Sequence, residues 1–318
     1  MNNRLETPFR PRRLGHANLF VGNYERAAEY YRRVAGFQEV YRQPDVMASF
    51  VSNGNTYHDV GLTDVQAPYA AKGQGPGLYH YAFELANEVE LVQGYRRAVD
   101  AGVKFVATKD HDVAHSLYLK DPDGLYFELY ADVVKDWRTA RRGIVSGKKP
   151  QWTPGVTTVP VEEHRYPVDP EIEIVRDAVF HPKRTTHVGV VAADYETMFD
   201  FYTRIVGLVP LLGGAGSDYA VLHGSHGSYA MTLYRQRKGL EPGFHHVGFE
   251  VWDEADLDRA VAAAPKADVR VERVVDHPAR KSVCILDPDG IRLQFYVNRN
   301  WTPQSIATVD AASAPYLL

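Results

Sequence analysis

Three segments with the alternation typical of β-strands each carry one side chain that can bind a metal ion. The two histidines are His16, in residues 14–21, and His80, in residues 78–85, and the carboxylate is Glu128, in residues 125–130. Side chains alternate between the faces of a strand, and each candidate ligand lies opposite the more apolar face. Two neutral imidazoles and one carboxylate, with positions left open, are typical of non-haem Fe(II) oxygenases. The pattern predicts a metal site in the cavity of a curved sheet with helices on its back.

A tight turn precedes the segment that carries Glu128. It reads Asp121-Pro122-Asp123-Gly124, in which Pro fixes φ and Gly is free to take a positive φ. Taken alone, Glu128 could be a solvated acid on an open sheet face. The two histidine segments favour the metal site instead.

Length, composition and charge exclude several classes of protein. The chain has 318 residues, enough for two domains with their own cores. No apolar run reaches ~18 residues, and the polar, Arg-rich N-terminus lacks a signal core, so we expect no membrane span. Net charge is 36 − 40 = −4 with scattered basic residues, which argues against nucleic-acid binding. The single cysteine, Cys284, forbids an intrachain disulfide and indicates a cytoplasmic protein.

The first half of the chain reads as two β-α-β-β-β units after a polar arm. A helix is expected at residues 24–35, after the N-cap Asn23 and before Gly36. A second helix is expected at residues 88–101, before Gly102. Strands are expected at residues 14–21, 37–41, 48–51, 57–62, 78–85, 104–107, 116–119 and 125–130. Residues 132–184 are rich in Pro, Arg, Lys and Val without a clear period. We expect this long linker to wrap over the body of the protein.

The second half repeats the first. His187 stands 171 residues after His16 (187 − 16), and His246 stands 166 residues after His80 (246 − 80). The Asp-Pro-Asp-Gly turn recurs at residues 287–290. The repeat predicts two related domains, residues 1–131 and 185–299, with a C-terminal tail at 300–318.

The two halves differ at the candidate ligands. Glu128 is answered by Gln294, and the position of His58 reads as Tyr229 or Ala230. A neutral amide is a far poorer ligand for a hard cation than a carboxylate. We therefore expect the metal site in the N-terminal domain and a degenerate site in the C-terminal domain.

These residues resemble the type I extradiol ring-cleaving dioxygenases, the catechol 2,3-dioxygenase-like members of the vicinal oxygen chelate (glyoxalase–bleomycin resistance–dioxygenase) superfamily. The family's ring-cleavage signature is matched by His111, Leu117-Tyr118, the turn at 121–124 and Glu128. Residues 75–80 (GPGLYH) resemble the strand of its second ligand, and residues 57–60 (YHDV) resemble its active-site histidine strand. The best-known two-domain members carry the site in the C-terminal half. The N-terminal placement seen here occurs in a subgroup.

The resemblance implies an α+β fold of two tandem vicinal-oxygen-chelate domains, each a curved, mostly antiparallel sheet around a cavity. It implies His16, His80 and Glu128 as ligands of Fe(II), with Mn(II) also possible. It implies that His58, His111 and Tyr118 are catalytic. The implied reaction inserts both atoms of O₂ into a catechol-type diol and opens the ring beside it. The implied assembly is a homo-oligomer, a dimer or tetramer.

Other interpretations of these residues stay open at this point. His58 could be a core histidine bonded to a carbonyl group, Tyr118 could be strand packing, and His115 could take the role of His111. On the same fold, the protein could be a glyoxalase-type isomerase or a thiol transferase that opens epoxides. It could also be a non-catalytic module that binds an aromatic ligand.

Overall fold

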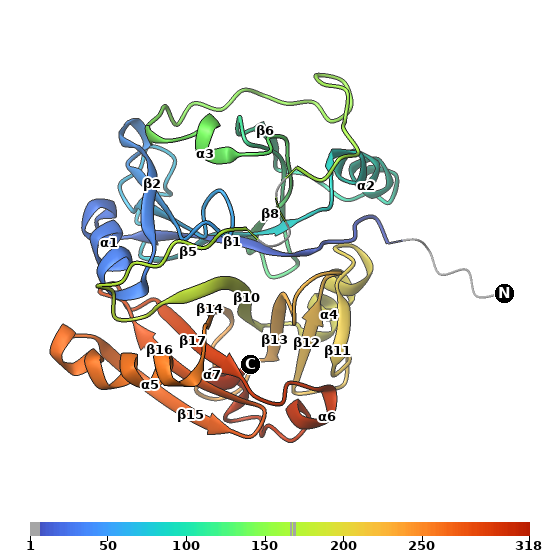
Figure 1. Ribbon diagram of the computed structural model, residues 1–318. Helices are drawn as coiled ribbons and strands as arrows, with labels where there is room; N and C mark the ends of the chain where they lie inside the picture. Colours follow the sequence, from blue (N-terminus) through green and yellow to red (C-terminus); the bar gives the residue numbers. More distant parts are fainter. Residues whose placement is uncertain (1–6, 166, 168–169) are drawn as a thin grey trace.

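Two β-sheets stacked one above the other make up the molecule (Figure 1). The computed structural model describes residues 7–165, 167 and 170–318. The N-terminal sheet and its helices lie in the upper half of Figure 1, and the C-terminal sheet lies in the lower half. In the described part of the chain, no helix is both long and apolar enough to cross a membrane. The α+β fold of two related domains predicted from the repeat is confirmed.

The N-terminal sheet places its candidate ligand strands at its centre. Its strand order is β6-β7-β8-β5-β1-β4-β3-β2-β9. Strands β1 and β4 are parallel, as are β5 and β8, whereas β1 and β5 are antiparallel. The bounds are β1 Arg13–Val21, β2 Gln38–Gln43, β3 Ala48–Ser52, β4 Val60–Asp64, β5 Gly77–Glu84, β6 Ala107–Asp110, β7 Ala114–Lys120, β8 Tyr126–Asp132 and β9 Gly143–Ile144.

The C-terminal sheet repeats this topology with eight strands. Its order is β11-β12-β13-β10-β14-β17-β16-β15, in which β10 is parallel to β13 and β14 to β17, as β1 is to β4 and β5 to β8. The bounds are β10 Pro182–Ala192, β11 Val209–Leu212, β12 Tyr219–His223, β13 Met231–Arg235, β14 Gly243–Val251, β15 Arg270–His277, β16 Arg280–Leu286 and β17 Arg292–Asn298.

Asparagine side chains cap the first two helices, and the first of these caps, Asn23, was predicted from the sequence. Asn23 accepts a hydrogen bond from the Arg26 N–H at the start of α1, and Asn87 accepts one from the Glu90 N–H at the start of α2. The helices are α1 Tyr24–Tyr30, α2 Glu88–Asp100, α3 Trp137–Ala140, α4 Tyr195–Arg204, α5 Glu254–Ala263, α6 Pro303–Ile306 and α7 Ala314–Leu317. A π-helical turn, Tyr31–Ala35, continues α1, and 3₁₀ turns occupy Pro44–Val46 and Ala264–Ala267.

Three predicted elements differ from the structure. The helix predicted at 24–35 is α-helical to Tyr30 and π-helical after it. The strand predicted at 57–62 is wrong for its first three residues, because β4 begins at Val60 and His58 lies in the loop before it. The strand predicted at 104–107 begins only at Ala107, so the chain from Gly102 to Val106 is a connection without regular structure.

The two domains pack back to back through a shared apolar core. One cluster joins Tyr81 and Phe127 of the first domain to Val188 and Tyr202 of the second. Hydrogen bonds add to this at the two Asp-Pro-Asp-Gly turns. Tyr202 Oη donates to Asp121 Oδ2 at 2.7 Å, and Tyr31 Oη donates to Asp287 Oδ2 at 3.3 Å. Each turn thus binds a tyrosine from the first helical segment of the other domain.

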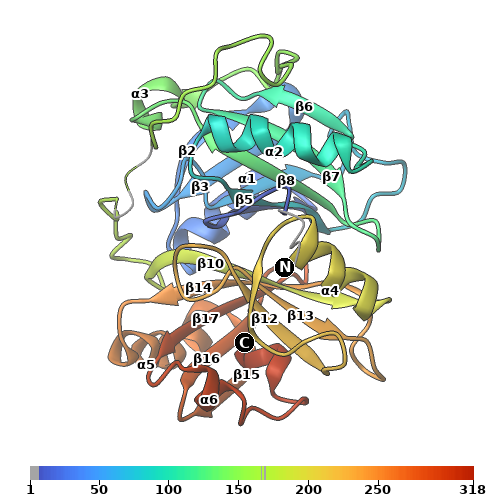
Figure 2. The ribbon, with the colours of Figure 1, turned by 90° about the vertical axis from the view of Figure 1, so that its right-hand side faces the viewer.

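The segment between the domains wraps over the N-terminal sheet (Figures 1 and 2). Trp152 is fully buried there, and Thr108 Oγ1 donates a hydrogen bond to its carbonyl oxygen. Residues 143–151, which we call the strap, start as β9 beside β2 and end where Gln151 pairs with Lys109 of β6. Because β2 and β6 lie at opposite sides of the sheet, the strap spans its concave face.

Candidate metal centre

The structure brings the three predicted ligands together. They come from the adjacent central strands β1, β5 and β8, and their ligating atoms all lie within 4.8 Å of one another. Glu128 Oε2 lies 3.3 Å from His16 Nε2 and 3.2 Å from His80 Nε2. The three side chains are buried, with exposed fractions of 0, 3 and 1% for His16, His80 and Glu128. Within the described residues, no other group of His, Cys, Asp and Glu converges in this way.

The protonation states of this cluster suit a cation. Burial alone would raise the pKa of Glu128, but hydrogen bonds from His16 and His80 outweigh it and hold that pKa well below its usual value. Burial lowers the pKa of His80, so its imidazole is neutral at pH 7. Among the described residues, Glu128 Oε1 has no hydrogen-bond partner. A buried anion with a free oxygen and two imidazole nitrogens within 3.3 Å of it fits a divalent metal ion.

His58 lies directly against the ligands. Its ring centroid is 4.1 Å from that of His16. Its Nε2 lies 3.0 Å from Asn18 Oδ1, and its Nδ1 lies 3.2 Å from the Tyr41 hydroxyl. Burial, followed by the neighbouring His16, holds the pKa of His58 well below its usual value. His58 is therefore a neutral imidazole held by two side chains, and no backbone carbonyl of the described residues binds its ring.

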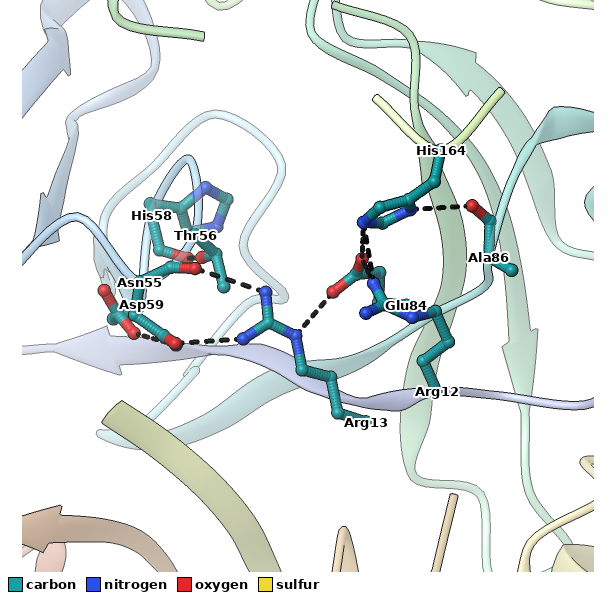
Figure 3. A network of polar contacts seen from close by, with 9 residues as sticks. All are labelled: Arg12, Arg13, Asn55, Thr56, His58, Asp59, Glu84, Ala86 and His164. Carbon is teal, nitrogen blue, oxygen red and sulfur yellow. Dashed lines mark hydrogen bonds and ion pairs between the residues drawn. The ribbon is translucent and has the colours of Figure 1, made fainter. Parts of the chain in front are cut away.

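A buried polar network fixes the loop that carries His58 (Figure 3). Arg13 donates to Asn55 Oδ1 at 2.9 Å and to the Asn55 carbonyl oxygen at 3.2 Å, and it also pairs with Glu84. Asn55 Nδ2 in turn donates to Asp59 Oδ1 at 3.0 Å. Asp59 follows His58 and is also bound by Thr185 of the second domain at 2.7 Å. The network ties this loop to β1, β5 and the other domain.

His111 and Tyr118 face each other at the other side of the ligands. The Tyr118 hydroxyl lies 2.8 Å from His111 Nε2, and the Tyr118 ring lies 5.5 Å from the ring of His80. Burial lowers the pKa of His111 to about 4, so its imidazole is neutral at pH 7. His115 points elsewhere, since it binds Glu88 at 2.7 Å and stacks on Trp152. His115 therefore does not replace His111 in the cavity.

A cavity of about 320 Å³ opens onto this cluster. It is lined by His58, His80, His111, Tyr118 and Glu128, by further aromatic rings, and by side chains of the strap. Phe50 and Tyr41 stack at 4.4 Å on one wall, and Tyr118 and Tyr126 stack at 5.3 Å on another. The size and the aromatic walls suit one small aromatic molecule.

The equivalent place in the C-terminal domain is filled by protein. His187 Nε2 lies 3.1 Å from His246 Nε2, and Tyr229 stacks on His187 at 4.1 Å, as His58 does on His16. The buried guanidinium of Arg280 lies 3.6 Å from the centroid of Tyr296 and donates to Tyr229 Oη.

The C-terminal tail closes the same cavity. Arg280 Nη1 donates to the Leu317 carbonyl oxygen at 3.0 Å, and Tyr234 donates to the Leu318 carbonyl oxygen. Leu317 and Leu318 are fully buried. In the C-terminal domain, the guanidinium of Arg280 and the packed tail thus fill the space that corresponds to the open cavity of the N-terminal domain.

The chain belongs to the glyoxalase/bleomycin resistance protein/dioxygenase superfamily, whose family model matches residues 13–129 and 184–295. Among curated proteins, it is 26% identical over 242 residues to the catechol-2,3-dioxygenase of Bacillus subtilis (strain 168), covering 75% of this chain and 74% of the relative. Over 127 residues it is 30% identical to metapyrocatechase 2 of Cupriavidus necator, covering 39% and 37%. The predicted resemblance to catechol 2,3-dioxygenases is confirmed.

Solved structures share the fold. The 2,3-dioxygenase LapB from Pseudomonas sp. KL28 aligns with a TM-score of 0.66 at 17% identity, covering 92% of this chain and 94% of that one. The Mn(II)-bound glyoxalase from Novosphingobium aromaticivorans aligns with a TM-score of 0.64 at 15% identity, covering 91% and 82%.

Three side chains of the site escaped sequence reasoning. Asn18, two residues after His16 on β1, lies 3.0 Å from His58 Nε2 and 3.1 Å from His80 Nε2 and so bridges the two rings. Arg141 and Lys149 line the cavity from the segment between the domains. That segment has no periodicity, so its sequence contains no signal that places a side chain over the sheet.

Proposed function

We propose that this protein is an Fe(II)-dependent extradiol dioxygenase that inserts both atoms of O₂ into a catechol and opens the ring beside the diol. The observation that carries the proposal is the convergence of His16, His80 and Glu128 at the floor of a cavity whose walls present His58, His111 and Tyr118. The similarity to catechol dioxygenases supports it. Mn(II) suits the same ligands and is the alternative metal.

The ligand set leaves room for both reactants. Three protein ligands on one side of an ion leave positions for the two oxygens of a catechol and for O₂. When bound, a ferrous ion would hold the diol and O₂ side by side and supply the electronic link between them. The protein's own contribution is to orient the ring, exclude water and manage protons.

Proton management falls to the three catalytic candidates. His58 is neutral and lies beside the ligands, so its imidazole can take a proton from the diol and return it later. Tyr118 stays protonated because burial, followed by the charge of Glu128, raises its pKa well above its usual value. Its hydroxyl can therefore donate a hydrogen bond to a substrate oxygen, and His111 orients it from 2.8 Å.

Anaerobic reconstitution with Fe(II) followed by oxygen uptake tests the proposal. Against a panel of catechols, we expect one O₂ consumed per catechol and a yellow ring-fission product. A glyoxalase-type isomerase or a thiol transferase would act on its own substrates without consuming oxygen. A non-catalytic aromatic-binding module would purify without metal, so metal analysis of the purified protein separates it. Either of these results would overturn the proposal.

Two further expectations concern the setting of the enzyme. We propose that it works in the cytoplasm, where the reducing environment keeps iron ferrous and the buried thiol of Cys284 unoxidised. We also propose a homo-oligomer, a dimer or tetramer. Light scattering coupled to size-exclusion chromatography measures the mass, and the mass of a single chain would contradict it.

A further inference from the structure

We propose that the catechol bound by this site carries an anionic substituent, with a carboxylate as its simplest form. The proposal rests on the proposed function and specifies its substrate class. Three cationic side chains carry it: Lys149 of the strap, Arg141 at the end of α3, and Lys109 of β6. All three line the cavity that opens onto the metal ligands.

The strap is held over the cavity at both ends. The Val145 N–H donates to the Arg42 carbonyl oxygen at 2.9 Å, beside β2. At the far end the Asp110 N–H donates to the Pro150 carbonyl oxygen at 3.2 Å, beside β6. Lys149 lies one residue before this second anchor. Backbone hydrogen bonds at both ends of the strap therefore fix the position of Lys149 over the concave face.

The ammonium of Lys149 is buried without a partner. Among the described residues, its Nζ has no hydrogen bond and almost no contact with solvent. A buried, unpaired charge is costly for a protein to keep. Its neighbour Lys148 is exposed, so the burial of Lys149 is specific to that position. An anion of the substrate would supply the missing partner.

Arg141 adds a second cation, one whose donors are only partly used. Its side chain is only 3% exposed and lies 5.0 Å over the Tyr41 ring. One end donates to the His111 carbonyl oxygen at 2.9 Å, and the other reaches the exposed Asp112 at 3.5 Å. Its Nε has no partner in the described part of the chain. Guanidinium groups present several donors to a carboxylate, so donor capacity remains for a ligand.

The charge balance of the cavity points the same way. Glu128 is the one carboxylate among the lining residues, and the metal ion would use it. Lys109, Arg141 and Lys149 are then left without an acidic partner inside the cavity. An excess of positive charge in a cavity lined largely by buried side chains favours an anionic ligand.

The position of the cations separates their role from diol binding. The ligands come from the central strands β1, β5 and β8, whereas the cations come from an edge strand and from the covering segment. A catechol bound to the metal by its diol would present the opposite end of its ring to the strap. The three cations are therefore placed to bind a substituent on the ring.

Matched acid and amide ligands test the proposal by equilibrium binding. Catechols with a carboxylate on tails of zero, one or two methylenes are titrated calorimetrically under argon, each against its own primary amide. The protein is loaded with redox-inactive Zn(II), so no turnover interferes. We expect the best acid to bind at least about tenfold tighter than its amide, as one charge-assisted hydrogen bond provides.

Variants assign the effect to Lys149. Lys149→Met should lower the acid-to-amide affinity ratio about tenfold, whereas the exposed control Lys148→Met should keep it. Equal lowering by both variants, or equal affinities of acid and amide for the unmodified protein, overturns the anionic substrate. The unmodified comparison decides the question even if Lys149→Met does not fold.

Oxygen uptake distinguishes this failure from that of the proposed function. If the Fe(II) protein consumes O₂ with amides and acids alike, the dioxygenase stands and the anionic substrate is wrong. If neither class binds and no oxygen is consumed, both proposals are wrong.

Discussion

Removing one hydroxyl at the domain junction should weaken the protein in a pH-dependent way. Tyr202→Phe deletes the 2.7 Å hydrogen bond to Asp121, where both side chains are buried. A hydrogen bond to a charged group contributes about 1.5–3 kcal/mol. The Tyr81 hydroxyl, 3.3 Å from the same oxygen, can take over part of the contact. We therefore expect the free energy of unfolding to fall by about 1.5–2 kcal/mol at pH 7.5.

The other Asp-Pro-Asp-Gly turn supplies the matched comparison. Tyr31→Phe removes a longer hydrogen bond, 3.3 Å to Asp287, so its cost should be nearer about 1 kcal/mol. Urea unfolding followed by tryptophan fluorescence measures both values. Since the domains share one core, each variant should unfold in a single transition.

The sign of the pH dependence follows from Asp121. Burial raises its pKa from 3.8 to about 6. The stability contributed by this group is therefore fully present below pH ~4 and lost as the pH rises through about 6. The tyrosine hydroxyl opposes that loss because it stabilises the ionised form. The cost of Tyr202→Phe should be largest above pH 7 and smaller at pH 5. A cost equal at pH 5 and pH 8, or smaller than that of Tyr31→Phe, would refute the reasoning.

Three predictions concern the site. Glu128→Gln introduces the amide that the C-terminal domain has at Gln294. The affinity for iron should fall by more than the about 10–100-fold that follows when a residue hydrogen-bonded to a ligand is mutated, and oxygen uptake should cease. A full equivalent of bound iron would contradict the ligand assignment. His58→Gln should retain iron and lower kcat by about 10²–10⁴-fold, whereas His115→Gln, on the far face of β7, should keep kcat in the folded fraction. Equal losses in kcat would remove His58 from catalysis. Asn55→Ala removes the side-chain hydrogen bonds that join the loop of His58 to Arg13 and Asp59, so kcat should fall about tenfold with iron content unchanged. Loss of iron instead would assign the loop to metal binding.

The sequence predicts the sheet centres better than their margins. His16, His80 and Glu128 stand in strands whose side chains alternate between the two faces, and this alternation predicts their shared face even though the pairing of β1 with β5 has two register shifts. The strand predicted over the loop before β4 is wrong because the polar residues of this loop form hydrogen bonds outside any strand ladder. Their partners are Ser52, just before the loop, and Arg13 and Thr185, which are distant in the chain. Such partners leave no local pattern.

The strap shows the same limit more sharply. Lys149 lies over the cavity because residues 143–151 are anchored to both sides of the sheet, and Arg141 lines the cavity from the end of α3, just before them. These contacts are long-range and involve the backbone, so composition does not reveal them. The length of the linker indicated that it covers the body, but not which of its side chains face inward.

Arg280 makes the division of labour between the halves hard to undo. A mutation that returned a carboxylate at Gln294 would create an acid in a cavity that already holds a buried guanidinium. An ion pair between the new carboxylate and Arg280 would then compete with metal binding. A metal site in the C-terminal domain would also require replacement of Arg280 and displacement of the C-terminal tail, and both changes would remove buried contacts. A second metal site would therefore need several coordinated changes and not a single substitution, because the buried guanidinium and the packed tail are held by contacts of their own.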